Sequence, residues 1–275
     1  MMMRKTLDSN YSEEHLIFLR KQKIEVFKIR FFQISILVSI IFLWEILAYF
    51  KLIDSFIMSS PSRIMKTIFN LYFNGQLWSN ILYTTLETII GFALGTLLGL
   101  FISTLIWWFP FSLKVGEPYL VILNALPKVA LGPIIILWMG ASMGSIIIMA
   151  LLVSVVISIM NILSGFQSVN KNEILLMKSF NANKFQIFTK LVFPANISTI
   201  ISTLKINVGM SLIGVITGEF LVSSSGIGYL IVYGGQVFKM DLVMSGILIL
   251  LILAWVMYAG VLKIESSYMK RHKDK

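Results

Sequence analysis

The stretch KSFNANKFQIFTKLVFP, residues 178–194, separates two long apolar runs and predicts a helical hairpin. Residues 170–180 are typical of a short helix, and Asn181 can take the left-handed conformation that ends such a helix. Asn183 can cap a second helix, because Gln186 stands three residues later in the capping-box position. Two short helices joined at asparagines predict a segment that lies outside the membrane spans.

The second helix of this hairpin is amphipathic. Its apolar face carries Phe185, Phe188 and Val192, flanked by Ile187 and Leu191, and its polar face carries Gln186, Thr189 and Lys190. Pro194 is expected to stop the helix and to disfavour helical geometry at Phe193. An apolar face of this size needs a cover. A soluble partner could supply it, or the hairpin could fold back on its own membrane helices, and the two interpretations are compatible.

The composition places the hairpin in a membrane protein. Of the 275 residues, 57% are hydrophobic and 13% are charged, which is outside the balance of an ordinary soluble domain. The chain has no cysteine, which excludes disulfides and thiolate chemistry. The two histidines, His15 and His272, lie in polar tails, which excludes a buried Ser-His dyad and most histidine metal sites. We therefore expect neither catalytic residues nor a metal site.

Six apolar stretches are each long enough, at about 20 residues, to cross a hydrocarbon core as a helix. They lie near residues 31–50, 80–107, 117–139, 142–165, 197–222 and 240–262. The third and fourth meet at WMGASMGS, where two glycines and two serines predict a tight turn. The predicted fold is an all-α integral membrane protein with about six transmembrane helices.

The basic side chains predict the orientation of these helices. Of the 23 Lys and Arg residues, 17 fall in the N-terminal tail, the loop after the fourth span, the C-terminal tail or at Lys114, all on one side. The opposite side has Lys51, Arg63, Lys66 and Lys239. Because cytoplasmic loops carry the excess of basic residues, we expect both termini and the 166–196 loop in the cytoplasm. The net charge of +10 then reflects topology, not nucleic-acid binding.

Two segments outside the spans are predicted to be helical. YSEEHLIFLRKQKIEVFKIRFF, residues 11–32, has loose helical spacing and predicts an interfacial helix on the inner leaflet or against the bundle. About 30 polar residues precede the first span, which disfavours a cleavable signal peptide. On the outer side, Ser60 is a plausible N-cap, Pro61 the first helical residue and Gly75 a stop, so a short surface helix is expected there.

Small residues predict where the second span packs. They recur at four-residue intervals on one helix face, as Gly91, Gly95, Gly99 and Ser103. Small residues at this spacing let a second helix approach closely in lipid. We expect tight helix packing along this face and no direct contact with a transported solute.

Charged residues within the spans are functional candidates by default. Lys128 lies roughly ten residues into the third span, close to Asn124 and Pro127. All three are candidates for the pathway or a gate. Lys128 could attract an anionic solute, hold a structural or gating position, or extend its ammonium group to the inner headgroups.

Two carboxylates and two glycines lie near the outer ends of the spans. Glu219 and Glu87 could pair with cations, line a vestibule, or stay solvated near the interface. Gly226 and Gly228 in SSSGIGYL are expected to shape a turn at an outer gate, with Glu219 as a further gate candidate. A serine protease is excluded for this motif, because no span contains a histidine.

The hairpin resembles the cytoplasmic loop in the membrane subunit of bacterial ABC importers. The family motif runs Glu-Ala-Ala, three residues, Gly, nine residues, Ile, one residue, Leu-Pro. In this chain Asn181 stands at the glycine and 191–194 at the Ile-x-Leu-Pro end. The Glu-Ala-Ala positions are occupied by Leu175, Leu176 and Met177, so the acidic residue of the motif is absent.

Other stretches resemble one branch of that family, which imports taurine, nitrate, alkyl sulfonates and, in some members, precursors of thiamine or riboflavin. They are SSPSRIMKTIF, NGQLWSNILYTTLETIIGFALGTLLG, ALPKVALGPIIILWMG, GFQSVNKNEILLMKSFNA and VITGEFLVSSSGIGYLI. The resemblance implies a type I importer permease fold with a coupling-helix hairpin. It implies a cytoplasmic segment over 1–30, an ABC permease transmembrane domain over 31–265 and a basic cytoplasmic tail over 266–275.

The chain has no GxxxxGK[ST] phosphate loop and so cannot hold a nucleotide in the P-loop manner, and the energy for transport must come from elsewhere. The resemblance implies two ATPase subunits that carry ATP and Mg²⁺, an extracellular binding protein that delivers the solute, and a second permease copy in the bacterial plasma membrane. No cofactor is expected on this chain itself. The residues implied to dock on the ATPase are Lys178, Ser179, Phe180, Asn181, Ala182, Phe185, Gln186, Phe188 and Pro194, with Phe180, Asn181, Phe185 and Phe188 forming most of the surface.

The main alternative is a secondary transporter driven by an ion gradient, and a third possibility is an exporter or a purely structural membrane subunit. A secondary transporter needs acidic or broken-helix ion sites near mid-membrane and is commonly built from an internal repeat. The sequence has few acidic residues in its central spans and no convincing repeat. Both observations disfavour a secondary transporter, and the resemblance favours the importer subunit.

Overall fold

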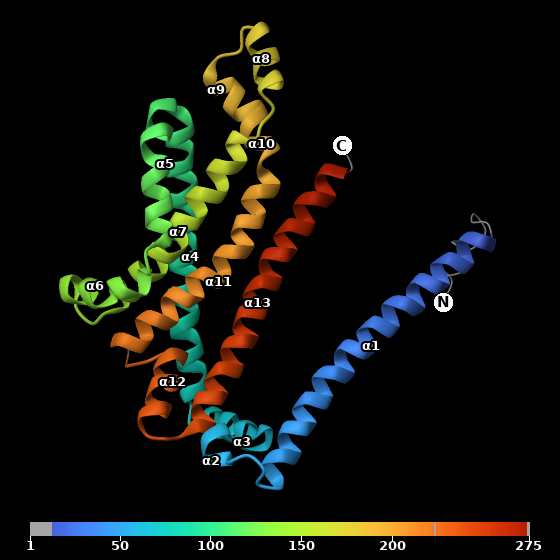
Figure 1. The fold of residues 1–275 in the computed structure, drawn as a ribbon, viewed down its shortest axis with the longest axis vertical. Helices are drawn as coiled ribbons and strands as arrows, with labels where there is room; N and C mark the ends of the chain where they lie inside the picture. The colour runs from blue at the N-terminus through green and yellow to red at the C-terminus, as the bar shows by residue number, and fades with distance from the viewer. Residues whose placement is uncertain (1–12, 223, 274–275) are drawn as a thin grey trace. The chain divides into compact units, whose positions relative to one another are not determined.

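The computed structural model describes residues 13–222 and 224–273, which form helices and turns and no strand. The first twelve residues of the predicted N-terminal segment and the last two of the basic tail lie outside the described residues. Figure 1 shows the helices, which are α1 Glu13–Tyr49, α2 Ser55–Met58, α3 Pro61–Phe73, α4 Gln76–Trp108, α5 Pro110–Ala125, α6 Gly132–Met139, α7 Met143–Gln167, α8 Lys171–Ser179, α9 Lys184–Ile187, α10 Phe193–Ala195, α11 Ile197–Val222, α12 Ile227–Gln236 and α13 Met240–Lys273. A 3₁₀ turn, Lys128–Leu131, precedes α6, and a π turn, Phe188–Val192, precedes α10.

The chain divides into two units, one up to Ile64 and one from Met65. In the first unit, α1 runs without a break from Glu13 to Tyr49, and its apolar part, Ile24–Tyr49, is long enough to cross a membrane. The helix expected over 11–32 is present over its described residues and continues into the span, and its position at the inner leaflet or against the bundle stays a prediction. No glycine or proline occurs within α1, so nothing in the sequence separates the basic segment from the span.

The predicted surface helix is confirmed as α3. Pro61 is its first residue, and the Ser60 hydroxyl oxygen accepts the backbone N–H of Arg63 at 3.4 Å. Gly75, with φ +70°, turns the chain from α3 into α4, and the left-handed conformation there is one that glycine adopts without strain.

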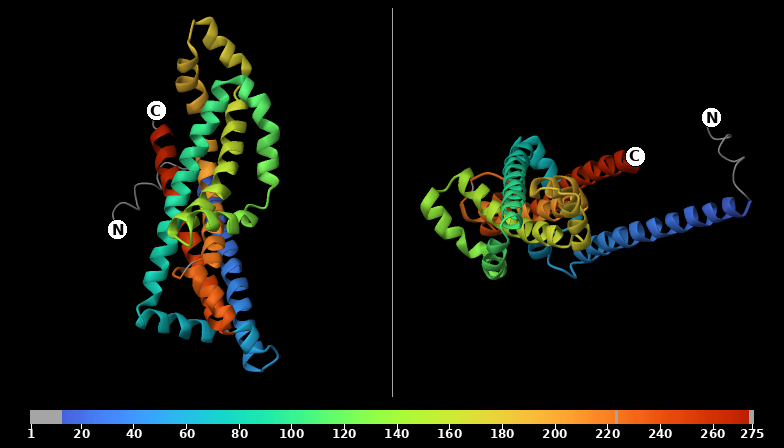
Figure 2. Two further views of the ribbon diagram at one scale, coloured as in Figure 1. Left: turned by 90° about the vertical axis from the view of Figure 1, so that its left-hand side faces the viewer. Right: turned by 90° about the horizontal axis from the view of Figure 1, so that it is seen from above.

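The second unit is built around α4, α7 and α11, which run side by side in Figures 1 and 2. The predicted glycine face packs α4 on α7: a Cβ at Gly91 would lie 2.5 Å from the Ala150 Cβ, and one at Gly95 only 1.9 Å from the Ser154 Oγ. Gly99 faces Ser158 in the same way. The tight packing predicted from these small residues is therefore confirmed.

The third predicted span is not one continuous helix. The helix α5 and the segment Lys128–Met139, which contains the 3₁₀ turn and α6, are bent by 85° at a break of two residues, Leu126 and Pro127. Pro127 has no backbone N–H and restricts Leu126 to extended geometry, with ψ 128°, which ends α5. A continuous helix over 117–139 was therefore wrong, although the bent pair can still count as one span.

The remaining helices complete the count of spans. Within residues 13–222 and 224–273, five helices are long and apolar enough to cross a membrane, and the bent pair makes up to six. The turn expected at WMGASMGS is present between α6 and α7, with Gly140 at φ +75° and Ser142 capping α7 together with Ser145. The fold is thus the predicted all-α membrane protein.

Candidate functional site

The hairpin of α8 and α9 is held by local hydrogen bonds. The side chain of Asn170 accepts the backbone N–H of Asn172 at 2.9 Å and begins α8. Asn181 has φ +58° and ends it. The backbone N–H of Gln186 donates to the Asn183 side chain, and that of Asn183 donates to the Gln186 side chain, both at 2.8 Å. The predicted cap, turn and capping box are all confirmed.

The end of the hairpin differs from the prediction at Pro194. Phe193 has helical dihedrals, φ −65° and ψ −49°, and its N–H donates to the carbonyl of Phe188 across a π turn. Pro194 then lies inside the next helical turn, which ends at Asn196. Proline has no backbone N–H and so needs no carbonyl acceptor in the preceding turn. The inserted π turn also shifts the backbone hydrogen-bond pattern that a proline within a regular α-helix would disrupt.

One side of the hairpin packs onto the membrane helices. Ile187 and Val192 are buried in one cluster with Ile162 and Phe166 of α7. Phe188 joins this side: its ring centroid lies 5.1 Å from that of Trp107 and 5.5 Å from that of Phe166. The hairpin therefore does fold back on its own membrane helices.

The other side is exposed and apolar. The exposed fractions are 76% for Phe180 and 63% for Phe185, and 60% and 57% for Leu175 and Leu176. The single apolar face predicted for the second helix is therefore divided, because Phe188 faces inward and Phe185 outward. Of the other residues implied to dock, Lys178, Ser179, Asn181, Gln186 and Pro194 are exposed and Ala182 is half-buried.

The two leucines were missed as part of this surface. They occupy the first two positions of the Glu-Ala-Ala element, and α8 presents both to solvent. The signal was present in the sequence, because a motif position that is acidic in the family carries an apolar residue here. The exposed apolar surface is defined as Leu175, Leu176, Phe180 and Phe185.

A second group of predicted site residues meets at the opposite end of α4 and α11. Glu219 is 1% exposed and Glu87 is 3% exposed, and their carboxyl groups interact. One oxygen of Glu219 accepts the Thr84 hydroxyl at 2.6 Å and the other accepts the N–H of Gly228 at 2.5 Å. In the described part of the chain neither carboxyl is solvated or paired with a cation, so these two interpretations were wrong, whereas a place in a vestibule stays a prediction.

The turn between α11 and α12 is fastened to α4 by these groups. The N–H of Ile227 donates to the Thr84 hydroxyl at 2.8 Å, and the N–H of Gly226 donates to the Asn80 side chain at 2.7 Å. Gly226 has φ +107°, and a Cβ there would lie 2.2 Å from a Glu219 oxygen. The two glycines therefore form the predicted turn, and Gly226 allows the buried carboxylate to reach it.

The third group surrounds the break between α5 and α6. The ammonium group of Lys128 donates to the carbonyl of Asn124 at 3.1 Å, one turn earlier. Asn124 and Pro127 are exposed and Lys128 is half-buried. Lys128 therefore stabilises the carbonyl end of α5 next to the break.

A polar groove that was not predicted from the sequence lies between α7 and α11. It has a volume of about 410 Å³ and is lined by Asn161, Ser164, Ser168, Thr199, Ser202 and Thr203. These polar side chains recur every three to four residues along each helix and so share one helix face, and this spacing could have predicted the groove. Buried hydrogen bonds also join these helices. The side-chain amide of Asn207 in α11 donates to the Ser158 hydroxyl of α7 at 2.5 Å and to the Thr96 hydroxyl of α4 at 2.9 Å.

Residues 91–264 match the family model of the binding-protein-dependent transport system inner membrane component. The formylaminopyrimidine transport permease protein ThiX of Halalkalibacterium halodurans is 30% identical over 84% of this chain and 92% of its own length. The taurine transport system permease protein TauC of Escherichia coli is 19% identical over 88% and 90%, respectively.

The fold has a solved counterpart. A chain in an inward-facing structure of the MetNI methionine ABC transporter superposes with a TM-score of 0.61 and 13% identity, over 68% of this chain and 94% of that one. At this identity the likeness establishes the fold alone. The family match covers most of the chain, from the glycine face of α4 to α13. The chain therefore belongs to the binding-protein-dependent transport system inner membrane components, the permease subunits of ABC importers.

Proposed function

We propose that this chain forms the translocation pathway of an ATP-driven importer and receives the energy of ATP through the α8–α9 hairpin. The observation that supports the proposal is the exposed apolar surface of the hairpin, whose opposite side is packed against the membrane helices. Four large apolar side chains face solvent, and none of them packs into the core beneath. Aromatic residues of this kind are the usual anchors of a protein interface.

The anchoring explains how force would reach the membrane helices. A short helix in a groove is a common mode of recognition. Here the opposite side of the hairpin is buried against α7 and the end of α4 through Ile187, Phe188 and Val192. Displacement of the docked surface would move these helices together, because a packed core transmits displacement.

The partners follow from the same proposal. ATPase subunits that carry ATP and Mg²⁺ dock on the hairpin, so its side of the membrane is the cytoplasm, in accord with the basic residues Lys171, Lys178, Lys184 and Lys190 around it. An extracellular binding protein delivers the solute. A second copy of the chain completes the pathway, and the polar groove between α7 and α11 is the surface that we expect to face the solute.

The solute is proposed to be small and either anionic or heterocyclic. The relatives named for taurine and formylaminopyrimidine support these two classes. The ligand that stabilises the partner binding protein against heat identifies the solute, because a ligand that binds only the folded state raises its stability. Taurine, an alkyl sulfonate, nitrate and hydroxymethylpyrimidine are the first candidates to test.

The proposal is tested by reconstituting the permease with its ATPase and binding protein in liposomes. We expect ATP hydrolysis and solute uptake to rise together when the solute-loaded binding protein is added. Uptake that requires an ion gradient and proceeds without the ATPase would instead identify a secondary transporter. A permease with its groove blocked, by Ser202→Trp, is expected to lose uptake while it still binds the ATPase.

A further inference from the structure

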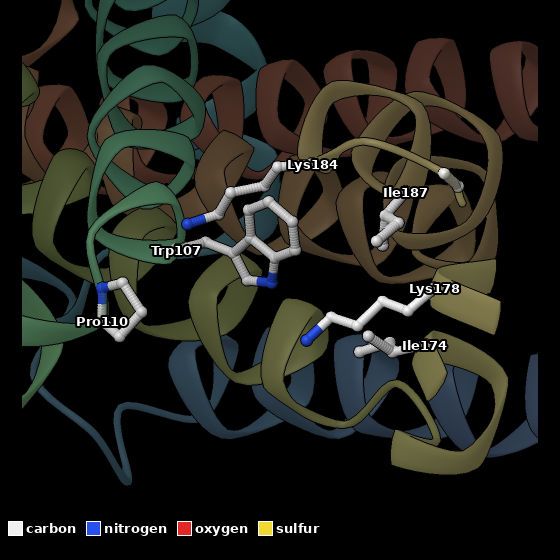
Figure 3. Close-up of a pocket in the computed structure, with 7 residues that line it drawn as sticks. Trp107, Pro110, Ile174, Lys178, Lys184 and Ile187 are labelled. Carbon is white, nitrogen blue, oxygen red and sulfur yellow. The ribbon is translucent and has the colours of Figure 1, made fainter. Parts of the chain in front are cut away.

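A cavity of about 390 Å³ lies between the hairpin and the turn that joins α4 to α5. Trp107 and Pro110 line it from the membrane helices, and Ile174, Lys178, Lys184 and Ile187 line it from the hairpin. Figure 3 shows both lysine side chains extending from the hairpin toward α4, with their ammonium groups on either side of the Trp107 ring in this view. The exposed apolar surface contributes none of these lining residues.

Two features of its walls lead us to infer that the cavity lies near a membrane interface. The helix α4 ends at Trp108 and α5 begins at Pro110, so the turn between two candidate spans forms one wall. Trp107 and Trp108 are adjacent at this end, and tryptophan is enriched at the depth of the lipid headgroups. A ligand in this cavity would therefore meet the headgroup region of the bilayer.

The two lysines make the cavity electropositive. Among the described residues the ammonium group of Lys178 makes no hydrogen bond or ion pair, although its backbone carbonyl accepts the N–H of Asn181. Lys184 is fixed in place: its ammonium group donates to the Trp108 carbonyl and lies 5.7 Å from the centroids of both indole rings. An ammonium group has three N–H donors, so Lys184 retains donors for a ligand. No acidic side chain lines the cavity.

The remaining walls are apolar. Pro110, Ile174 and Ile187 provide hydrocarbon surface next to the two ammonium groups. A free inorganic anion would use only the lysines, whereas an amphiphile with an anionic head would use both kinds of wall. The combination of charge, apolar walls and interfacial depth therefore favours a lipid.

We propose that this cavity binds the phosphate-bearing headgroup of an anionic phospholipid, held by Lys178 and Lys184, with the glycerol and upper acyl carbons against the apolar walls. A lipid in this position bridges the hairpin and the α4–α5 turn. Anionic lipid would then stabilise the side of the hairpin that rests on the membrane helices.

The test is a titration of the full chain in detergent with brominated phosphatidylglycerol, in which bromine quenches the fluorescence of nearby tryptophan. Brominated phosphatidylcholine and inorganic phosphate are the parallel ligands. We expect phosphatidylglycerol to quench more strongly than phosphatidylcholine, and Trp107→Phe to reduce this difference between the two lipids. Inorganic phosphate at millimolar concentration is expected to displace the lipid only in part.

The lysine variants decide the assignment. Each basic residue close to an anionic lipid surface changes affinity by about fivefold, so Lys178→Gln is expected to weaken binding by that factor and Lys178→Arg to restore it. Lys190→Gln, on the same hairpin but outside the cavity, is the matched control and is expected to bind like the unaltered chain. Equal binding of Lys178→Gln and Lys190→Gln, or equal binding of the two lipids, would overturn the proposal. Complete displacement of phosphatidylglycerol by inorganic phosphate would show that the cavity binds free phosphate and not a lipid.

Discussion

The α8–α9 hairpin and the turn at Gly226 both reverse the chain between membrane helices, but they are held in opposite ways. The hairpin is closed by partners three residues apart, Asn183 and Gln186. The turn is closed by side chains of α4 that precede it by more than 140 residues, Thr84 and Asn80. The hairpin therefore keeps its shape from its own sequence and leaves an apolar surface free, whereas the turn exists only when α4 and α11 pack together.

The largest effect is expected from removing the long-range partner of the turn. Glu219→Ala leaves the Thr84 hydroxyl and the Gly228 N–H without an acceptor and opens a cavity. Unsatisfied buried groups and a cavity together predict a loss of about 3 to 5 kcal/mol in the free energy of unfolding. The measurement is denaturant unfolding of the purified chain in detergent, with the exposed Glu117→Ala as control, and equal unfolding midpoints would contradict the burial of Glu219.

A smaller effect is expected from the packing that brings α4 to its partners. Gly95→Ala places a methyl group where the Ser154 Oγ lies, which predicts a loss of about 1 to 3 kcal/mol. Gly209→Ala on α11 is the matched control, because no atom lies within 4 Å of the added Cβ. There the substitution is expected to stabilise the helix by about 0.5 to 1 kcal/mol. Stabilisation by Gly95→Ala as well as by Gly209→Ala would show that the glycine face does not limit the approach of α7.

The smallest effect is expected from a substitution in the hairpin, whose hydrogen-bond partners are close in the sequence. Asn183→Ala removes the capping box of α9 and is expected to lower stability by about 1 kcal/mol. Hydrogen exchange should increase within the hairpin and remain unchanged at the Gly226 turn. Faster exchange at both places would show that the two elements are coupled, and it would refute the view that the hairpin is closed locally.

The same difference explains which features could be predicted from the sequence. The caps, the left-handed Asn181 and the glycine face are set by neighbours in the chain or by one helical period, and all were predicted. The burial of Glu87 and Glu219 could not be predicted, because their partners come from other helices and a carboxylate near the end of a span has a solvated alternative.

Two errors had local causes. Pro194 was expected to end a helix, and one continuous helix was expected over 117–139. Instead Pro194 lies inside a helical turn, and α5 ends before Pro127. At Pro194 a π turn precedes the ring, and at Pro127 no such turn is present, so α5 ends. The division of the hairpin was missed because Phe185 and Phe188 share a broad helical face, and the three aromatic rings that draw Phe188 inward lie elsewhere in the sequence.

The division between Phe185 and Phe188 gives the most direct test of the proposed coupling. The measurement is the affinity of the purified ATPase for three forms of the permease in nanodiscs, together with their thermal unfolding midpoints. We expect Phe185→Ala to unfold like the unaltered permease but to bind the ATPase at least tenfold more weakly, because an exposed aromatic anchor contributes more than about 1.4 kcal/mol to binding. Phe188→Ala is expected to lower the unfolding midpoint, because it removes a ring packed against Trp107 and Phe166. Unchanged ATPase affinity in Phe185→Ala would contradict the account.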